Sequence, residues 1–415
     1  MAIIKPFAAF RPVSTIVSQV AALPYDVMDR QEAKEMAKNN IHSFLHVDKA
    51  EIDLPDDVHP YDEQVYQKAR ENLYKMMEEG VYQQDQTPSL YLYRLTMAGR
   101  AQIGIVGCLP IDAYLQNDIK KHELTRADKE QDRIRHVDTC NAHTGPIFLT
   151  YPQQHSLDQL IEEYVEKNDP VYDFTSSDQV QHEVWHIFDP KVIQLIQKNF
   201  QNIPTLYIAD GHHRAASAVK VGQQRRKENP NYTGEEEFNF FLGVLFPHNQ
   251  LQILDYNRVV KDLNGWTKEE FLLAIQSSFI VSPWTGCEPY RPTKPHIFGM
   301  YLDNQWYVLE AKDTIINFSD PVARLDVSIL QKYLLHPILG IQDPRTDERI
   351  DFIGGIRGLK ELEKRVNNDM IVAFSMYPTT IEELMEVADQ DKLMPPKSTW
   401  FEPKLRSGIF IHTLD

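Results

Sequence analysis

The stretch LYIADGHHRAASAVKV, residues 206–221, places two histidines and an arginine between a strand-like run and a helix-like run. Gly211 lets the backbone approach a ligand closely, and the free N–H groups in the first turn of a helix bind anions. His212, His213 and Arg214 would add donors on that turn, including a guanidinium fork suited to phosphate. The stretch therefore predicts a phosphate site.

Asp210 ends the strand-like run of this stretch. A carboxylate beside a phosphate cradle can hold Mg²⁺ or orient a histidine, so we expect Mg²⁺ as a cofactor with Asp210 as its ligand. The alternative is a plain strand-to-helix turn in which Asp210 caps the helix and the histidines face solvent. The GxxxxGK[ST] spacing of a P-loop is absent.

A second group of cations lies in IKKHELTRADKEQDRIRHVDT, residues 119–139. Arg126, Lys129, Arg133 and His136 fall at i, i+3, i+7 and i+10, which places them on one face of a helix. A basic face in an acidic chain favours an anionic ligand. Acidic residues interleave with the stripe, however, and a solvated helix with internal salt bridges explains it as well.

Two further pairs could do acid–base chemistry. His122 and Glu123 precede the basic helix and form a possible general base with an orienting partner. Tyr25 and Asp26, in ALPYDVM, lie in a turn after an apolar stretch, and their chemistry is open.

The tail MPPKSTWFEPKLRSGIF offers cations and hydroxyl groups at Lys397, Ser398, Thr399 and Lys404. Two successive prolines keep the chain extended, so the segment could wrap a phosphate. It could equally be a strap that packs through its aromatic residues.

The composition of the chain limits the ligands that these residues can bind. The chain has 415 residues, 42% of them hydrophobic and 25% charged, which indicates a globular protein of two or perhaps three domains. Its 43 basic and 60 acidic residues give a net charge of −17, which opposes binding to nucleic acid or to an anionic membrane. Three cysteines without CxxC spacing and a start without an apolar signal region predict a cytoplasmic protein without disulfides.

Strands are expected in hairpins more often than in β-α-β alternation, which predicts an α+β fold with mixed sheets. The hairpins should turn at Ala98-Gly99 and at Asp303-Asn304. Helices are expected near 62–80, 125–139, 214–227, 321–336, 356–367 and after Thr379 or Thr380. We expect an N-terminal region, residues 1–200, and a C-terminal region, residues 201–415, that holds the DGHHR core and the tail.

Four segments together resemble the domain-of-unknown-function 1015 family: PYDV, KKHELTRADKEQDR, IADGHHRAASA and MPPKSTWFEPKLRSGIF. The resemblance runs from Phe7 almost to the C-terminus. DGHHR is also similar to the DGHTR element of free-serine kinases in the ParB/sulfiredoxin-like superfamily, where the loop holds phosphate groups at a helix N-terminus. This second resemblance covers some tens of residues and implies a ParB/sulfiredoxin-like core around the strand–turn–helix.

The resemblances imply phosphoryl transfer to free L-serine, giving O-phosphoserine. No adenine-binding signature is visible, which favours pyrophosphate over a nucleotide as the donor. Carried over residue by residue, DGHHR is the phosphate loop, with His213 where the kinases have threonine. The catalytic glutamate of the kinases corresponds to Glu123 or to Asp26, and Tyr25 and His122 are expected substrate contacts.

The full set of expected phosphate contacts is Gly211, His212, Arg214, Arg133, His136, Lys397, Ser398, Thr399 and Lys404, and the expected catalytic residues are Glu123, Asp210, His213 and Asp26. Two alternatives use the same anion site: a phosphoserine phosphatase, and a ParB-like nucleotide-binding module without catalytic activity. The acidic composition counts against DNA for the latter.

Overall fold

The computed structural model describes residues 1–415, which form two compact units. The first unit contains Met1–Lys121, Thr125–Leu251 and Pro403–Asp415, and the second contains His122–Leu124 and Gln252–Glu402. The short segment 122–124 groups with the second unit because the carbonyl of His122 accepts a hydrogen bond from the backbone N–H of Met394 at 2.7 Å.

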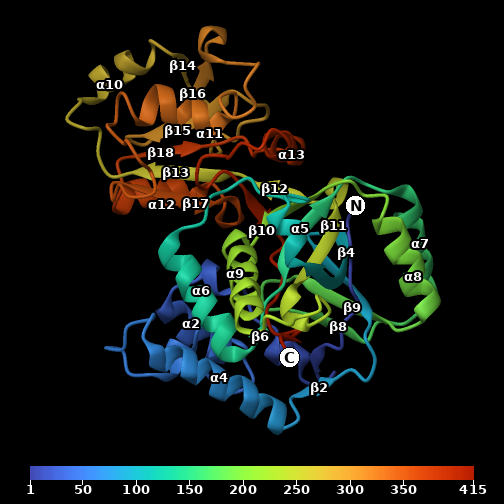
Figure 1. The fold of residues 1–415 in the computed structure, drawn as a ribbon. Helices are drawn as coiled ribbons and strands as arrows, with labels where there is room; N and C mark the ends of the chain where they lie inside the picture. Colours follow the sequence, from blue (N-terminus) through green and yellow to red (C-terminus); the bar gives the residue numbers. More distant parts are fainter. The chain divides into compact units, whose positions relative to one another are not determined.

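An eight-stranded mixed sheet forms the centre of the first unit (Figure 1). Its strands pair antiparallel except for two parallel pairs, β5 with β10 and β7 with β11. In spatial order they are β5 (Ile119–Lys120), β10 (Leu206–Asp210), β7 (Ile147–Tyr151), β11 (Phe240–Pro247), β4 (Arg100–Pro110), β3 (Leu90–Met97), β9 (Gln181–Ile187) and β8 (Tyr172–Thr175).

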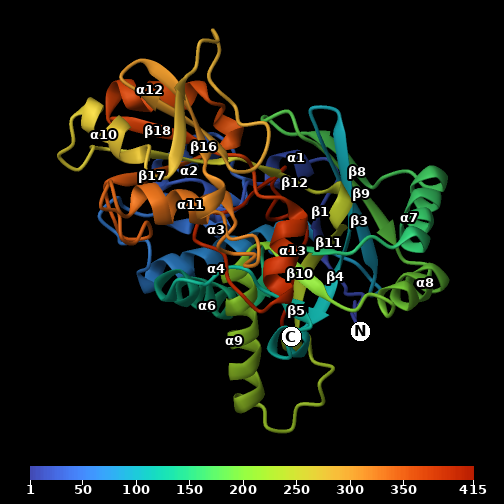
Figure 2. The same ribbon diagram turned by 90° about the horizontal axis from the view of Figure 1, so that it is seen from above.

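The helices of the first unit bury an apolar stripe each. In α4, Val65, Ala69, Leu73 and Met76 are buried at the spacing that predicted this helix. Figures 1 and 2 show α6 and α9 side by side, and α7 and α8 together at one side of the sheet. The helices are α1 (Val17–Val20), α2 (Arg30–Ala37), α3 (Leu45–Asp48), α4 (Glu63–Glu78), α5 (Ile111–Leu115), α6 (Ala127–Cys140), α7 (His155–Lys167), α8 (Pro190–Phe200) and α9 (His212–Glu228).

Two small antiparallel pairs complete the first unit. Strand β1 (Phe10–Pro12) pairs with β2 (Tyr82–Gln84). Strand β6 (Ala142–His143) pairs with β20 (His412–Thr413), which brings the C-terminal segment back to the first unit.

The second unit contains a six-stranded sheet that is antiparallel throughout. Its order is β14 (Phe279–Pro283), β16 (Gln305–Ala311), β15 (Ile297–Leu302), β18 (Val372–Ser375), β13 (Tyr256–Val260) and β17 (Ile350–Gly354). A separate pair joins β12 (Gln252–Leu254) to β19 (Trp400–Glu402). Its helices are α10 (Lys268–Ile275), α11 (Asp326–Leu330), which continues as a π-helical turn over Gln331–Leu335, α12 (Lys360–Asn368) and α13 (Ile381–Asp389).

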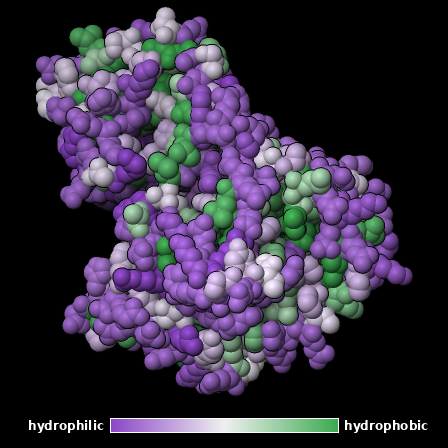
Figure 3. All heavy atoms as spheres, viewed as in Figure 1, coloured by the Kyte–Doolittle hydropathy of each residue, from purple (hydrophilic) through white to green (hydrophobic).

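The expected α+β class with mixed sheets and hairpins is confirmed. The expected division at residues 200 and 201 falls inside the eight-stranded sheet, because β10 and β11 pair with strands from before residue 200. None of the helices combines the length and the apolar character that crossing a membrane requires. On the face drawn in Figure 3, hydrophilic residues cover most of the surface and hydrophobic ones form separate patches.

Candidate functional site

The DGHHR stretch forms a strand–turn–helix in the first unit. Strand β10 ends at Asp210, Gly211 adopts the left-handed conformation with φ 94°, and α9 begins at His212. A Cβ on Gly211 would lie 3.1 Å from the guanidinium of Arg214. Gly211 carries no side chain that could cap α9. The turn therefore presents the N-terminus of a long helix together with an arginine that folds back toward it.

A small cavity of about 30 Å³ lies beside this turn, inside the first unit. Its volume has room for about two water-sized groups. The polar residues that line it are Tyr25, Asp48, Arg133, His136, His143, Thr144, Arg214 and Ser217. Two of the four basic positions predicted on α6, Arg133 and His136, thus share one cavity with Arg214 of the DGHHR stretch.

Arg214 has a hydrogen-bond donor at this cavity that no protein acceptor uses. Its Nη1 donates to the carbonyl of Pro146 at 2.5 Å, whereas its Nε is fully buried and contacts no hydrogen-bond acceptor. Burial lowers the pKa of Arg214, but the carboxylates of Asp26 and Asp210 outweigh it and raise the pKa. The guanidinium stays charged and keeps at least one N–H for a ligand.

Arg133 is buried and held by Asp132, whose Oδ2 accepts from Nε at 2.9 Å. Its guanidinium lies over the ring of Tyr25, 4.0 Å from the centroid. Burial raises the pKa of the Tyr25 hydroxyl, and the charge of Asp26 raises it further. Tyr25 is therefore a neutral hydroxyl at the cavity, and Arg133 adds a second positive charge.

The lining of the cavity also includes an imidazole, His136, and a carboxylate, Asp48. His136 Nε2 donates to the carbonyl of Val47 at 3.2 Å, and burial, followed by the charge of Arg133, lowers the pKa of His136. Asp48 accepts from the hydroxyl of Thr144 at 2.8 Å. The lining of the cavity therefore contains two arginines and one carboxylate.

Asp210 pairs with Lys404, whose Nζ donates to Oδ2 at 3.0 Å, while Oδ1 accepts from the N–H of Gly211 at 2.8 Å. Burial alone would raise the pKa of Asp210, but the charges of Lys404 and Arg214 lower it well below the usual carboxyl value. Both carboxylate oxygens already accept hydrogen bonds, so a metal ion bound directly would have to displace a cation. The arrangement fits Mg²⁺ held through water or through a bound phosphate better than direct coordination.

His213 is placed to connect α9 with α6. Its Nε2 accepts a hydrogen bond from the backbone N–H of Arg126 at 3.0 Å, which puts the ring proton on Nδ1. Burial lowers the pKa of His213, so the ring is neutral at neutral pH. His213 is not among the residues that line the cavity.

Three of the residues predicted in the tail, Lys397, Ser398 and Thr399, belong to the second unit. In the tail, Lys397 adopts a left-handed backbone conformation with φ 58°, and the hydroxyl of Ser398 donates to the carbonyl of Pro395 at 2.6 Å. Thr399 follows them in the same unit. Lys404 differs from these three because it lies in the first unit, against Asp210.

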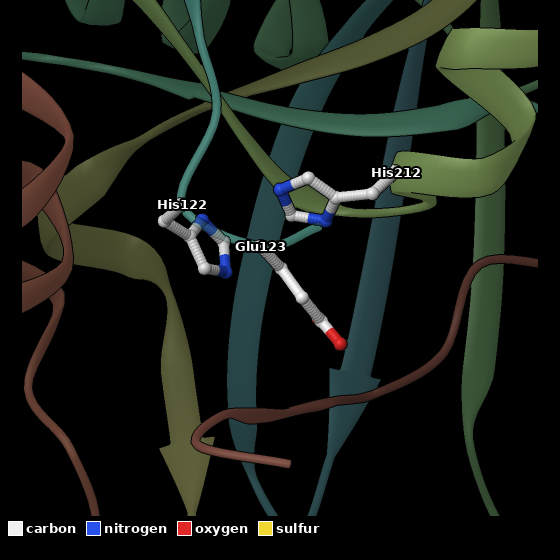
Figure 4. Close-up of side chains that lie close together, drawn as sticks. All are labelled: His122, Glu123 and His212. Atoms are coloured by element: carbon white, nitrogen blue, oxygen red, sulfur yellow. The ribbon is translucent and has the colours of Figure 1, made fainter. Parts of the chain in front are cut away.

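His122 and Glu123 also belong to the second unit. Figure 4 draws them on the segment that leads to α6, and draws His212 on the first turn of α9. Imidazole side chains suit a transition metal, whereas Mg²⁺ prefers ligands that are all oxygen.

Sequence reasoning missed several residues of the cavity, above all Asp48, His143, Thr144 and Ser217. A signal was present for two of them, because His143 and Thr144 form a polar run between a helix and an apolar strand. Nothing in the local sequence around Asp48 or Ser217 indicates a site.

A model of the family described as a protein of unknown function (DUF1015) matches residues 4–328 of the chain. No curated protein matches it. Among solved structures, a mutant free serine kinase in complex with AMP is 12% identical with a TM-score of 0.37, covering 72% of this chain and 92% of that one. A conserved hypothetical protein from Pyrococcus furiosus is 14% identical with a TM-score of 0.36, covering 74% and 94%.

SbnI with a C-terminal truncation, from Staphylococcus aureus, is 12% identical with a TM-score of 0.39, covering 73% of this chain and 85% of that one. All three TM-scores are below 0.5.

Proposed function

The chain belongs to the DUF1015 family of proteins of unknown function. For this member we propose the activity of a phosphotransferase that transfers a phosphoryl group to the hydroxyl of free L-serine. The observation that carries the proposal is the spare, fully buried Nε of Arg214 at a cavity that also contains Arg133. A buried guanidinium with an unused donor beside a helix N-terminus suits an anion with several negative charges.

Phosphoryl transfer suits these residues because the reaction depends mainly on positioning and on neutralising charge. Arg214 and the N-terminus of α9 would hold the donor, and Arg133 would balance charge across the cavity. The serine oxygen forms the new P–O bond, the bond to the leaving phosphate breaks with its electron pair, and the hydroxyl proton goes to a base. Asp26 and Glu123 are the carboxylates that the sequence suggests for the base.

Pyrophosphate is the donor that we propose, with a nucleotide as the alternative. Tyr25 is the phenol ring in the lining of the cavity, and it already lies under the guanidinium of Arg133. Mg²⁺, if bound, would supply further neutralisation of the phosphate charge. Asp210 and Lys404 would orient that ion and the donor from the β10 side.

A donor screen tests the proposal. The full chain is incubated with L-serine, Mg²⁺ and pyrophosphate, ADP, ATP or polyphosphate in turn, and O-phosphoserine is detected by mass spectrometry. We expect product with pyrophosphate and its loss in EDTA. Arg214→Ala should abolish product, whereas Arg226→Ala should not, because Arg226 is engaged by Asp112 near the far end of the same helix.

Two arms of the same assay separate the alternatives. Phosphate released from O-phosphoserine in the absence of any donor would identify a phosphatase instead. Nucleotide binding without turnover of any donor would identify a binding module. Absence of O-phosphoserine with every donor overturns the proposal.

A further inference from the structure

Two buried imidazoles meet beside the cavity, in the small sheet formed by β6 and β20. His143 and His412 are directly opposite each other in the antiparallel register. Their rings stack with centroids 5.3 Å apart, and the two Nδ1 atoms are 3.1 Å apart, at hydrogen-bond distance. Only 6% of His143 and 2% of His412 is exposed, so water does not compete for this contact.

The outer end of the pair reaches the surface through a carboxylate. His412 Nε2 lies 2.8 Å from Oε2 of Glu237, and Oε1 of Glu237 accepts from the ammonium of Lys5 at 2.9 Å. The side chain of Glu237 is 31% exposed. A hydrogen-bonded chain therefore runs from buried histidines to a carboxylate in contact with solvent.

The inner end of the pair is at the cavity. His143 lines the cavity together with Arg214. Its Nδ1 is occupied by His412, whereas its Nε2 is buried and contacts no hydrogen-bond partner. Nε2 is thus the atom that His143 offers to a group in the cavity.

The hydrogen bonds fix the tautomers of both rings. Glu237 can only accept, so Nε2 of His412 carries a proton, and Nδ1 of a neutral His412 has a lone pair. The Nδ1–Nδ1 hydrogen bond then requires a proton on Nδ1 of His143. In a neutral His143 this leaves a lone pair on Nε2, which makes that atom a proton acceptor.

We propose that His143 is the general base that takes the proton of the substrate hydroxyl, an inference that rests on the proposed function. His412 and Glu237 then relay a proton toward the surface. His143 replaces the two carboxylates suggested by the sequence in this role. The substrate class is the small alcohol of the proposed function, whose hydroxyl would reach Nε2 of His143 at the cavity.

Each step of the relay conserves protons. The hydroxyl proton moves to Nε2 of His143 as the oxygen attacks phosphorus. The proton on Nδ1 of His143 passes to Nδ1 of His412, which becomes an imidazolium paired with Glu237. That ring then loses its Nε2 proton to solvent by way of Glu237. The resting tautomers return when Nε2 of His143 gives its proton to the leaving phosphate, Nδ1 of His412 returns its proton to Nδ1 of His143, and Nε2 of His412 takes a proton back through Glu237.

The charges around the pair agree with neutral rings at rest. Burial lowers the pKa of His143 well below its usual value, and His412 and Arg225 lower it further. Burial also lowers the pKa of His412, although Glu237 opposes the shift and Lys5 adds to it. For Glu237, burial raises the pKa, but hydrogen bonds from His412 and Lys5 lower it below the usual carboxyl value.

Kinetics of matched variants test the relay. His143→Gln should lower kcat for O-phosphoserine formation by about 100-fold or more and leave the Kd for pyrophosphate within about threefold, since a general base contributes to turnover. His412→Gln should lower kcat by about tenfold, and the double variant should be no slower than His143→Gln, because the two residues act as one unit. His155→Gln, at an exposed position on α7, is the control and should leave kcat unchanged. A kcat within threefold for His143→Gln, or additive losses in the double variant, overturns the relay.

A second measurement does not depend on turnover. Nitrogen NMR of histidine-labelled wild-type protein reports the tautomer of each ring, with the variants used for assignment. We expect a proton on Nε2 of His412 and a lone pair on Nε2 of His143; a proton on Nε2 of His143 at pH 7 overturns the relay. If wild-type protein forms no O-phosphoserine, the proposed function fails, and the NMR result still decides whether the relay exists.

Discussion

Two charged side chains in each unit differ in whether they have an ion-pair partner. In the first unit, Arg133 pairs with Asp132, and Asp210 pairs with Lys404. In the second unit, burial is the main influence on Arg258 and Asp326, and neither has a counter-charge beside it. The first pair of groups stays ionised, whereas Arg258 and Asp326 form hydrogen bonds with backbone groups.

Arg214 and Arg258 show the difference between the cationic groups. Carboxylates raise the pKa of Arg214, and its Nε remains unused. Arg258 is only 4% exposed, and burial lowers its pKa to about 10. Its guanidinium donates to the carbonyls of Tyr256 and Lys397, so its hydrogen bonds hold the chain.

Asp210 and Asp326 show the same difference between the anionic groups. Cations lower the pKa of Asp210, whereas burial raises the pKa of Asp326 to about 8. Asp326 accepts one hydrogen bond, from the N–H of His296 at 2.8 Å, and its Oδ2 is buried without a partner. A buried charged group with a counter-charge stays ionised and can interact with a ligand. A buried charged group without one lowers the free energy of unfolding unless it becomes neutral.

The largest effect is expected for Arg214→Lys. A lysine keeps the charge but loses the fork and the spare Nε, so the Kd for pyrophosphate should rise by about 100-fold, or about 2.7 kcal/mol. Isothermal titration calorimetry measures it, with Arg226→Lys on the same helix as the control. Affinity within a few-fold of wild type would place the phosphate site elsewhere.

The same substitution at Arg258 should act on stability. Arg258→Lys leaves the carbonyl of Tyr256 or Lys397 without its donor, which should lower the free energy of unfolding by about 2 kcal/mol. Urea unfolding measures it, with the half-exposed Arg345→Lys as the control. If Arg258→Lys weakens pyrophosphate binding as strongly as Arg214→Lys does, the two arginines do not have separate roles.

Asp326→Asn should change how stability depends on pH. The pKa of Asp326 is about 8 in the folded protein and about 3.9 when unfolded. Between these values unfolding releases a proton, so the wild type loses stability as pH rises toward 8. The variant should be the more stable protein at pH 8.5 by about 1 kcal/mol or more, and the gap should shrink at pH 5. Parallel pH profiles of the unfolding free energy in the two proteins contradict the assignment.

The smallest effect is expected at the outer end of the basic helix. The side chain of Arg126 is 60% exposed and pairs with Asp128, so Arg126→Ala should change the Kd for pyrophosphate by less than about twofold. Arg133→Ala, on the inner face, should weaken binding by about tenfold. Equal losses in the two variants would mean that the whole stripe binds the ligand.

The parts of the fold that neighbouring residues determine, such as turns and helix caps, could be predicted from the sequence. Ala98 and Gly99, and Asp303 and Asn304, adopt positive φ in the predicted hairpin turns, and Thr380 caps α13 with Glu383 in a capping box. The apolar stretch LQILDYNRVV, residues 251–260, could read as one strand but divides into β12 and β13. At the break, Asp255 accepts from Arg291, and its carbonyl accepts from the N–H of Gly355.

The candidate site could be predicted only as far as its residues are neighbours in the chain. Asp210 to Arg214 are consecutive in the sequence, so their residue types and their position between a strand and a helix could be predicted. His143 and His412 are 269 residues apart, and each is a single histidine in its segment. Their contact arises from the pairing of β6 with β20, which no periodicity in either segment indicates.

The return of Pro403–Asp415 to the first unit has a consequence for biosynthesis. These residues leave the ribosome after the whole of Gln252–Glu402, so the second unit can fold while the first still lacks a strand. His412 and Lys404 reach their partners last. A nascent chain thus carries Asp210 before Lys404, the cation that pairs with it.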